Sequence, residues 1–309
     1  MTTIRIANAP CSWGSLEFEG LAGQPLTCER MLDELVETGY TGTELGDWGF
    51  MPTEPAALRQ ILETRGVTLV GAFVPVRFCD ASAHADGAET AVKVARLLAG
   101  AASHDHSPMI ILADENGTVP QRTANAGRVT AAMGLDKDAW HVFARGAEQV
   151  ALAVRERTGL PVGFHHHCAG YVETPDEIDT LLKHTSAELL GLVFDTGHYA
   201  FGAGDRDGSL TRAGLERFAS RITHIHYKDC EPDIATRSAA EGWDYFQSVG
   251  QGVFCELGKG CVDFDWTTRW LRQRNYGGFI TVEQDVLPGM GAPKESAQRN
   301  REYLKTLGL

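Results

Sequence analysis

The chain has 309 residues, 43% of them hydrophobic, and a formal net charge of −13 from 28 basic and 41 acidic side chains. This length suits one large α/β domain or two smaller ones. The acidic balance argues against a general nucleic-acid-binding protein, which needs a basic face for the phosphates. The sequence contains no apolar run of about 18 residues, so no membrane span is expected. Its first residues, MTTIRIANAP, lack the pattern of a secretory signal.

Apolar runs of strand length alternate with helical patterns along the chain. Thr27 is the expected N-cap of the first helix, and Gly159 follows the long fourth one. In chain order the predicted elements are strand 4–9, helix 27–38, strand 41–46, helix 54–65, strand 67–76, helix 83–102, strand 109–113, helix 136–158, strand 161–166, helix 175–184, strand 189–195, helix 209–219, strand 222–227, helix 264–274, strand 279–284 and helix 293–307.

Eight strands alternating with eight helices predict parallel strands joined by crossovers. Eight repeats favour a closed (β/α)8 TIM barrel formed as a single domain by residues 1–309. An open doubly wound sheet is the alternative, but no GxGxxG motif follows the first strand. The stretches 114–134 and 229–262 are expected to be long irregular loops. Both follow a strand, which places them over the C-terminal mouth of the barrel, where the active sites of this fold lie.

Seven cysteines are present, an odd number, and no two of them form a CxxC pair. This pattern argues against a zinc ribbon and against a redox motif. Free thiols in a reducing cytoplasm are therefore expected. Cys11 and Cys168 fall near the predicted mouth, but no thiol-activating pattern surrounds them.

Polar side chains cluster where the predicted strands end. In chain order they are Glu44, Asp114, Glu115, His165, His166, His167, Asp195, His198, His224, His226, Lys228, Asp229, Glu283 and Asp285. A carboxylate or imidazole at a barrel's strand end is costly unless it is paired or bound to a metal. Several of them converging on one mouth predict a metal site. Mixed imidazole and carboxylate ligands favour Mn²⁺, Co²⁺, Fe²⁺ or Zn²⁺ over Ca²⁺ or Mg²⁺.

Strand alternation narrows the candidates, because successive residues face opposite sides. His165 and His167 share one face and His166 points the other way, while His224 and His226 share a face. One member of each pair is expected to be a metal ligand and the other a substrate contact. The sequence leaves open which of His165 and His167 binds the metal.

Three further residues are candidates for the mouth of the barrel. Trp13 follows the first strand and is a candidate wall of a sugar pocket. Glu44 is a candidate substrate contact, with a pairing carboxylate as the equal alternative. Glu115 opens a long mouth loop, ADENGT, and is a candidate catalytic acid.

Several segments resemble the xylose-isomerase-like TIM barrels, the sugar phosphate isomerase/epimerase superfamily, and within it the inosose (2-keto-myo-inositol) dehydratases. The likeness spans nearly the whole chain. The segments that carry it are NAPCSWG (8–14), GTELGDWGFMPTEP (42–55), GAFVPV (71–76), LADENG (112–117), GFHHHCAGYVET (163–174), LVFDTGHYAFGAGD (192–205), ITHIHYKD (222–229) and QGVFCELGKGCVDF (251–264).

The resemblance implies a divalent metal held by Glu, Asp, His and Glu at the ends of strands five to eight. Asp195, His226 and Glu283 match the last three ligands, and the first falls on His165, with His167 as the alternative. Mn²⁺ or Co²⁺ is expected, with Zn²⁺, Fe²⁺ and Mg²⁺ as alternatives. In the epimerases the first glutamate also acts as a proton-transfer base, so its replacement by histidine puts epimerase chemistry in doubt.

The resemblance further implies dehydration of a keto-cyclitol by enolate formation and β-elimination of water. Candidate bases are Glu283, His198 and an unligated member of the histidine run; candidate acids are Lys228 and Glu115. His167 and His224 are the remaining candidate substrate contacts.

Other functions remain alternatives. An isomerase or epimerase of keto-sugars, or a lyase acting on a 3-keto-glycoside, would begin with the same enolate. A metal-dependent hydrolase like the endonuclease IV relatives is disfavoured by the acidic charge, and a non-catalytic sugar-binding subunit is disfavoured by the retained ligands. We expect a cytoplasmic enzyme of inositol catabolism with a small keto-polyol substrate and neither nucleic acid nor membrane as a partner. The sequence leaves open whether it forms a homo-oligomer.

Overall fold

A computed structural model describes residues 3–14, 26–287 and 289–309 of the chain. Within these residues eight parallel strands close into a barrel in the order β1-β10-β7-β6-β5-β4-β3-β2. The predicted (β/α)8 barrel is therefore confirmed. Its strands are β1 (Ile4–Asn8), β2 (Gly42–Glu44), β3 (Thr68–Val76), β4 (Met109–Asp114), β5 (Val162–His165), β6 (Gly191–Asp195), β7 (Ile222–Tyr227) and β10 (Gly278–Val282).

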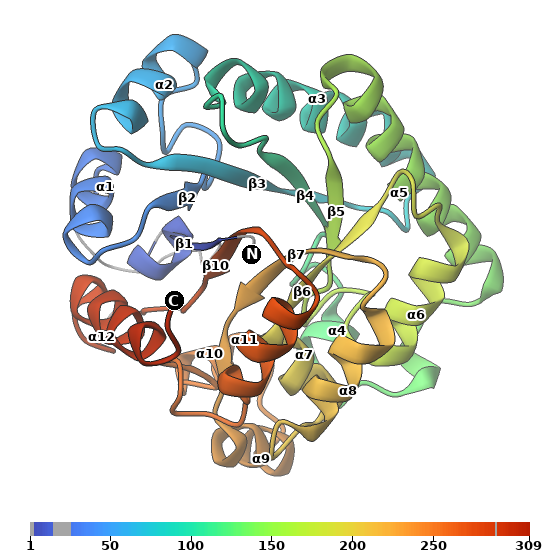
Figure 1. Cartoon of the computed structure of the whole chain (residues 1–309). Coiled ribbons are helices and arrows are strands. Elements are labelled where there is room, and N and C mark those ends of the chain that lie inside the picture. Colours follow the sequence, from blue (N-terminus) through green and yellow to red (C-terminus); the bar gives the residue numbers. More distant parts are fainter. Residues whose placement is uncertain (1–2, 15–25, 288) are drawn as a thin grey trace.

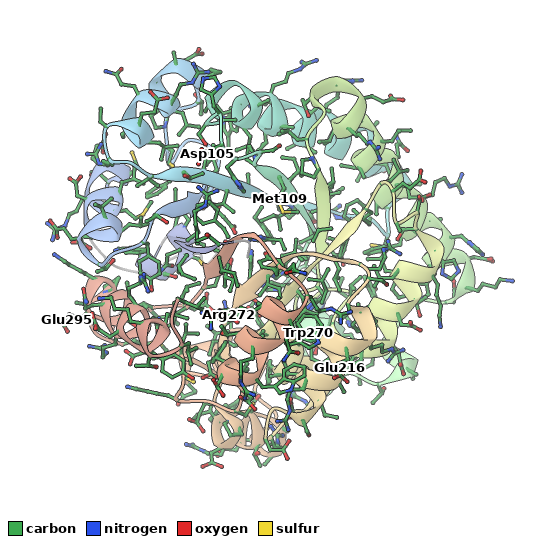
Figure 2. All side chains as sticks on the ribbon, viewed as in Figure 1. Asp105, Met109, Glu216, Trp270, Arg272 and Glu295 are labelled. Atoms are coloured by element: carbon green, nitrogen blue, oxygen red, sulfur yellow. The ribbon has the colours of Figure 1, made fainter. Side chains whose placement is uncertain are left out.

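The helices surround the ring of strands (Figure 1). Eight of the helices match the sequence prediction to within one or two residues at each end. They are α1 (Cys28–Glu37), α2 (Pro55–Glu63), α3 (His84–Ala101), α5 (Lys137–Thr158), α6 (Pro175–His184), α8 (Ser209–Phe218), α11 (Phe264–Gln273) and α12 (Pro293–Thr306). The exposed Glu295, labelled in Figure 2, lies on α12.

Local capping sets where several of these helices begin and end. Thr27 accepts a hydrogen bond from the backbone N–H of Arg30, as expected of an N-cap. Gly159 ends α5 with a φ of 75°, in the left-handed region that glycine enters without steric cost.

The two stretches expected to be irregular contain secondary structure. Residues 114–134 include α4 (Pro120–Ala124) and a 3-10 turn at Ala131–Met133. Residues 229–262 include the antiparallel pair of β8 (Asp229–Cys230) and β9 (Phe254–Cys255), and the helices α9 (Pro232–Glu241) and α10 (Tyr245–Gly250). The expectation of long structureless loops was wrong, since these elements are too short to produce a recognisable periodicity.

The segment 229–262 is fixed to the barrel by one buried carboxylate. Asp229 accepts hydrogen bonds from the backbone N–H groups of Cys230, Gly258, Gly260 and Val262, at 2.8 to 3.1 Å. These hydrogen bonds hold residues 258–262, the last part of the segment, next to Asp229 at the end of β7. The segment therefore forms an ordered part of the barrel mouth.

The barrel interior is apolar at its base and polar at its mouth. Ala7, Val70 and Phe279 pack together inside the ring, and Phe279 leaves room only for a glycine at position 42. Met109, labelled near the centre of Figure 2, forms a second interior cluster with Ile111 and Val193. These apolar side chains fill the lower part of the barrel interior. The polar groups of the interior therefore lie near the carboxyl ends of the strands, where the active sites of this fold are found.

Candidate functional site

A cavity opens at the carboxyl ends of the strands. Five of the candidate residues line it, namely Glu44, His165, His167, Lys228 and Glu283. Its wall also includes Cys11 and Asp285, both of which the sequence placed near the mouth without a role, and the residues Phe73, Asn116, Tyr245 and Phe246, which no sequence pattern indicated as site residues. Asp285 lies two residues beyond Glu283, at the end of the same strand. Tyr245 and Phe246 could not be selected from the sequence, because they lie on the unpredicted helix α10.

Strand register brings four potential metal ligands together. Asp195 on β6 pairs with His226 on β7, and His165 and Glu283 stand at the ends of the flanking strands β5 and β10. One ligand atom from each residue lies within 4.8 Å of the others. His226 Nδ1 is 3.2 Å from Glu283 Oε1 and 3.9 Å from Asp195 Oδ2, and His165 Nε2 is 3.7 Å from Asp195 Oδ2.

The structure separates the three members of the histidine run. His165 Nε2 faces Asp195, whereas His167 lines the cavity and its Nδ1 lies 2.6 Å from the carbonyl oxygen of Cys168. His166 points away from the cavity, where its Nε2 accepts the backbone N–H of Asp195 at 3.2 Å. The opposite directions of His165 and His166 follow the predicted alternation, and the group of four contains His165.

Buried polar atoms without partners show that the four residues fit a cation. Asp195 directs Oδ1 to the backbone N–H of His198 at 2.7 Å, which caps α7 (Thr196–Ala203). Its Oδ2 is fully buried and has no hydrogen-bond partner, and the same holds for His226 Nδ1. An uncompensated buried carboxylate oxygen is costly. Imidazole and carboxylate together are a donor set suited to first-row divalent ions.

Charges within the site determine how its groups ionise. Burial opposes the charge of Glu283, but His226 and Lys228 hold the pKa of this carboxyl well below its usual range. Burial also opposes protonation of His226, yet Glu283 and Glu44 raise the pKa of its imidazole well above the usual value. Both carboxylates therefore favour the charged form of this imidazole, and a metal ion bound at Nδ1 would take the place of the proton there.

Lys228 is the buried cation of the cavity wall. Its Nζ lies 3.0 Å from Asp285 Oδ2 and 3.6 Å from Glu283 Oε2, and the ammonium faces the ring of Phe254 at 4.8 Å. Burial alone would lower its pKa, but Asp285 and Glu283 reverse the shift and raise it. Lys228 is thus a fixed positive charge and hydrogen-bond donor, and its raised pKa weighs against its expected role as a proton donor.

Four candidate residues occupy places other than those expected. Trp13 is 3% exposed and packs in the outer core, where its Nε1 donates to Glu34 at 3.1 Å. Glu115 is held by Arg77 at 3.1 Å, away from the cavity, and its neighbour Asn116 lines the cavity instead. Neither Trp13 nor Glu115 belongs to the described part of the cavity wall, so their contact with the substrate stays a prediction. Trp13 is buried in the hydrophobic core, and Glu115 forms an ion pair with Arg77.

The other two are buried around the cavity and do not belong to the part of its wall that the structure describes. His198 stacks behind His167 with ring centroids 3.8 Å apart, and its Nδ1 accepts the backbone N–H of Cys168 at 3.4 Å. His224 lies deeper in the barrel, 3.0 Å from Thr281 Oγ1. In these places His198 packs against the ring of His167, and His224 contacts Thr281 and lies near Glu44.

Within the described residues no helix has both the length and the apolar character needed to cross a membrane.

Comparison with known proteins finds one family over most of the chain. The family described as xylose isomerase-like TIM barrel matches residues 32–307. The inosose dehydratase of Geobacillus kaustophilus is 30% identical over 304 residues, which cover 98% of this chain and 94% of that protein.

Solved structures share the fold at low identity. The probable 3-DHS dehydratase AsbF of Bacillus anthracis superposes with a TM-score of 0.68 at 13% identity, covering 98% of this chain and 99% of that one. The IolI protein with a bound zinc atom gives a TM-score of 0.62 at 13% identity, covering 98% of each chain.

Proposed function

Because this chain belongs to the xylose isomerase-like TIM barrel family, we propose that it is a divalent-metal-dependent hydro-lyase that removes water from a keto-cyclitol such as 2-keto-myo-inositol. One observation carries the proposal: the four ligand atoms converge, and two of the residues that offer them, His165 and Glu283, line the same cavity as His167 and Lys228. The near-full-length similarity to inosose dehydratases supports the choice of substrate class. We place the reaction in inositol catabolism on the same ground.

The metal would be held by His165, Asp195, His226 and Glu283. Mn²⁺ or Co²⁺ is our first expectation, and Zn²⁺ belongs in the test because the IolI structure contains it. A bound divalent ion supplies Lewis acidity, which polarises a ketone oxygen and makes the neighbouring C–H more acidic.

His167 is the residue best placed to take the proton from that carbon. Its Nδ1 faces a carbonyl oxygen, which can only accept, so the ring proton lies on Nδ1 and the lone pair on Nε2. Burial and the neighbouring His165 lower the pKa of His167 to about 3, which keeps the ring neutral at physiological pH. A neutral imidazole with a fixed tautomer is suited to general base catalysis.

Lys228 would act on the hydroxyl that leaves from the next carbon. Its ammonium is fixed by Asp285 and Glu283 at the cavity wall, where it can donate a hydrogen bond to the departing oxygen. The C–H proton passes to His167 Nε2 and the C–O bond breaks. The proton held by His167 then passes to the departing hydroxide, so that one water leaves and the imidazole is neutral again. The ketone is retained next to the new carbon–carbon double bond.

The test combines metal analysis with product analysis. The purified protein is stripped with a chelator, reloaded separately with Mn²⁺, Co²⁺ or Zn²⁺, and incubated with 2-keto-myo-inositol. We expect metal-dependent formation of a product lighter by one water, followed by mass spectrometry. A product of unchanged mass would favour the isomerase alternative, and no turnover with any of the three ions would contradict the proposal.

A further inference from the structure

We infer that Glu44 is a positioning residue that orients one metal ligand, His226, and that it does not bind a second cation. The inference rests on the metal centre of the proposed function. Glu44 stands at the end of β2, while His226 stands on β7, so the contact between them spans the inside of the barrel.

The two nitrogens of His226 face different partners. Nδ1 lies 3.2 Å from Glu283 Oε1, on the side of the four convergent ligands, and Nε2 lies 2.9 Å from Glu44 Oε1. Glu44 and His226 are both buried, at 3% and 0% exposure. A neutral imidazole carries one N–H, and a metal ligand atom must lack it. Among the described residues neither Glu44 Oε1 nor His226 Nε2 has a hydrogen-bond partner, although the two atoms lie 2.9 Å apart. With a cation bound, we expect this contact to become a hydrogen bond in which Glu44 holds the proton on Nε2 and leaves the lone pair of Nδ1 directed at the cation.

His224 and Thr281 complete the support below the ligand group. His224 Nε2 is 3.0 Å from Thr281 Oγ1 and 3.8 Å from Glu44 Oε1. The rings of His224 and His226 stand perpendicular, with centroids 5.3 Å apart. Two imidazoles thus flank the Glu44 carboxylate, and its Oε1 lies nearer to His226 Nε2 than to His224 Nε2.

Glu44, His224 and His226 also offer three ligand atoms within 4.8 Å of one another, which raises the alternative of a second cation. Two observations disfavour a second zinc ion, the cation used in the test below. The 2.9 Å between Glu44 Oε1 and His226 Nε2 is shorter than the roughly 3.3 Å between two ligands that each lie about 2.0 Å from a tetrahedral zinc ion. The nitrogen of His224 that faces Glu44 is Nε2, and this atom is already hydrogen-bonded to the hydroxyl of Thr281.

Zinc alone is the probe for the test, and the proteins are the full chain as wild type, Glu44→Gln and Glu44→Ala. Asp47→Asn is the matched control, because Asp47 is an exposed carboxylate at the same cavity. Stoichiometry is measured by metal analysis and affinity by competition with a chromophoric chelator. Thermal unfolding of the metal-free proteins reports whether each variant folds.

We expect one zinc per wild-type chain. Glu44→Ala should weaken zinc binding by about 10- to 100-fold, the usual effect of removing such an outer carboxylate. Glu44→Gln should retain more affinity, since its amide oxygen can still accept the Nε2–H, and Asp47→Asn should bind like the wild type. In samples with nitrogen-15-labelled histidine, zinc-loaded wild type should show His226 protonated at Nε2.

Three results would overturn the inference while leaving the proposed function in place. Two zinc ions per wild-type chain, with one lost in Glu44→Ala, would mean that Glu44 holds a second cation. An unchanged zinc affinity in both Glu44 variants would exclude a positioning role, and a raised KM with that unchanged affinity would identify a substrate contact. A wild-type protein that binds none of the three metals would instead refute the metal centre of the proposed function.

Discussion

The Nδ1 atom of His167 lies 2.6 Å from the carbonyl oxygen of Cys168, the residue next to it in the chain. The contact fixes the ring after β5 has ended, on a turn where the following residue, Ala169, has a φ of 69°. The backbone N–H of Ala169 is in turn bound by Glu173 at 2.9 Å. A short turn that is hydrogen-bonded in this way sets both the tautomer and the direction of a cavity histidine.

Replacement of His167 by Gln should lower kcat by about 10²- to 10⁴-fold, because a positioned general base is removed. The zinc content should stay at the wild-type value, since His167 does not belong to the four convergent ligands. Steady-state kinetics and metal analysis on one preparation measure both effects. His184→Ala, a change of an exposed histidine on α6, is the control. Unchanged kcat in His167→Gln would assign the proton transfer to another group.

Replacement of Asp195 should abolish metal binding and activity together. Asp195→Asn keeps an oxygen for the backbone N–H of His198, so the N-cap of α7 is preserved. Asp195→Ala also loses that cap, at a further cost of about 1 kcal/mol in unfolding free energy. Metal analysis and urea unfolding of the two variants separate these effects. Full activity and full metal content in Asp195→Asn would remove Asp195 from the proposed ligands.

Arg122→Ala should destabilise the protein by about 3–5 kcal/mol, the cost of breaking a buried ion pair. Arg122 is 0% exposed, forms two 2.8 Å bonds with Glu177, and donates from Nε to the carbonyl oxygen of Gly170 at 2.8 Å. Its loss would remove the guanidinium from Glu177 Oε1 and from the carbonyl oxygen of Gly170, while Glu177 Oε2 would keep the backbone N–H groups of Glu173 and Thr174. Urea unfolding measures the change.

The matched control is Arg157→Ala, which breaks the exposed pair of Arg157 with Glu89. Surface pairs contribute about 0–1 kcal/mol, so this variant should differ little from the wild type. Equal losses of stability in the two variants would show that burial gives the Arg122 pair no special weight.

Asp114 should make stability depend on pH in the direction opposite to that of most carboxyls. Burial raises its pKa to about 7, and its Oδ2 accepts the backbone N–H of Tyr171 at 3.0 Å. The folded state thus binds a proton that the unfolded state releases near its ordinary value of 3.8. The stability gained from this bound proton is complete below about pH 4 and is lost as the pH rises to about 7.

Asp114→Asn imitates the protonated form and removes this dependence. Between pH 5 and pH 8, wild type should lose unfolding free energy relative to Asp114→Asn, by an amount on the order of a few kcal/mol at about 1.4 kcal/mol per pH unit. Urea unfolding of both proteins across this range measures it. A wild type that gains stability relative to the variant would mean that Asp114 is ionised in the folded protein.

The amino-acid sequence by itself determined the barrel and the elements that carry Asp195, His226 and Glu283. Alternation of apolar runs is a local property, so it could be read without knowledge of contacts. Parallel strands all end at the same rim, which is why polar residues at separate strand ends could be expected to meet. Alternation within β5 also predicted that His165 and His166 face opposite ways.

Tertiary structure alone decided the rest. Beyond the last strand residue the direction of a side chain depends on the path of the loop, so the sequence could not separate His165 from His167 or predict that Asn116 replaces Glu115 at the cavity. The contact of Glu44 with His226 joins strands far apart in the chain and exists only because the barrel closes. Trp13 lies in the outer core for the same reason: packing partners distant in sequence determined its position.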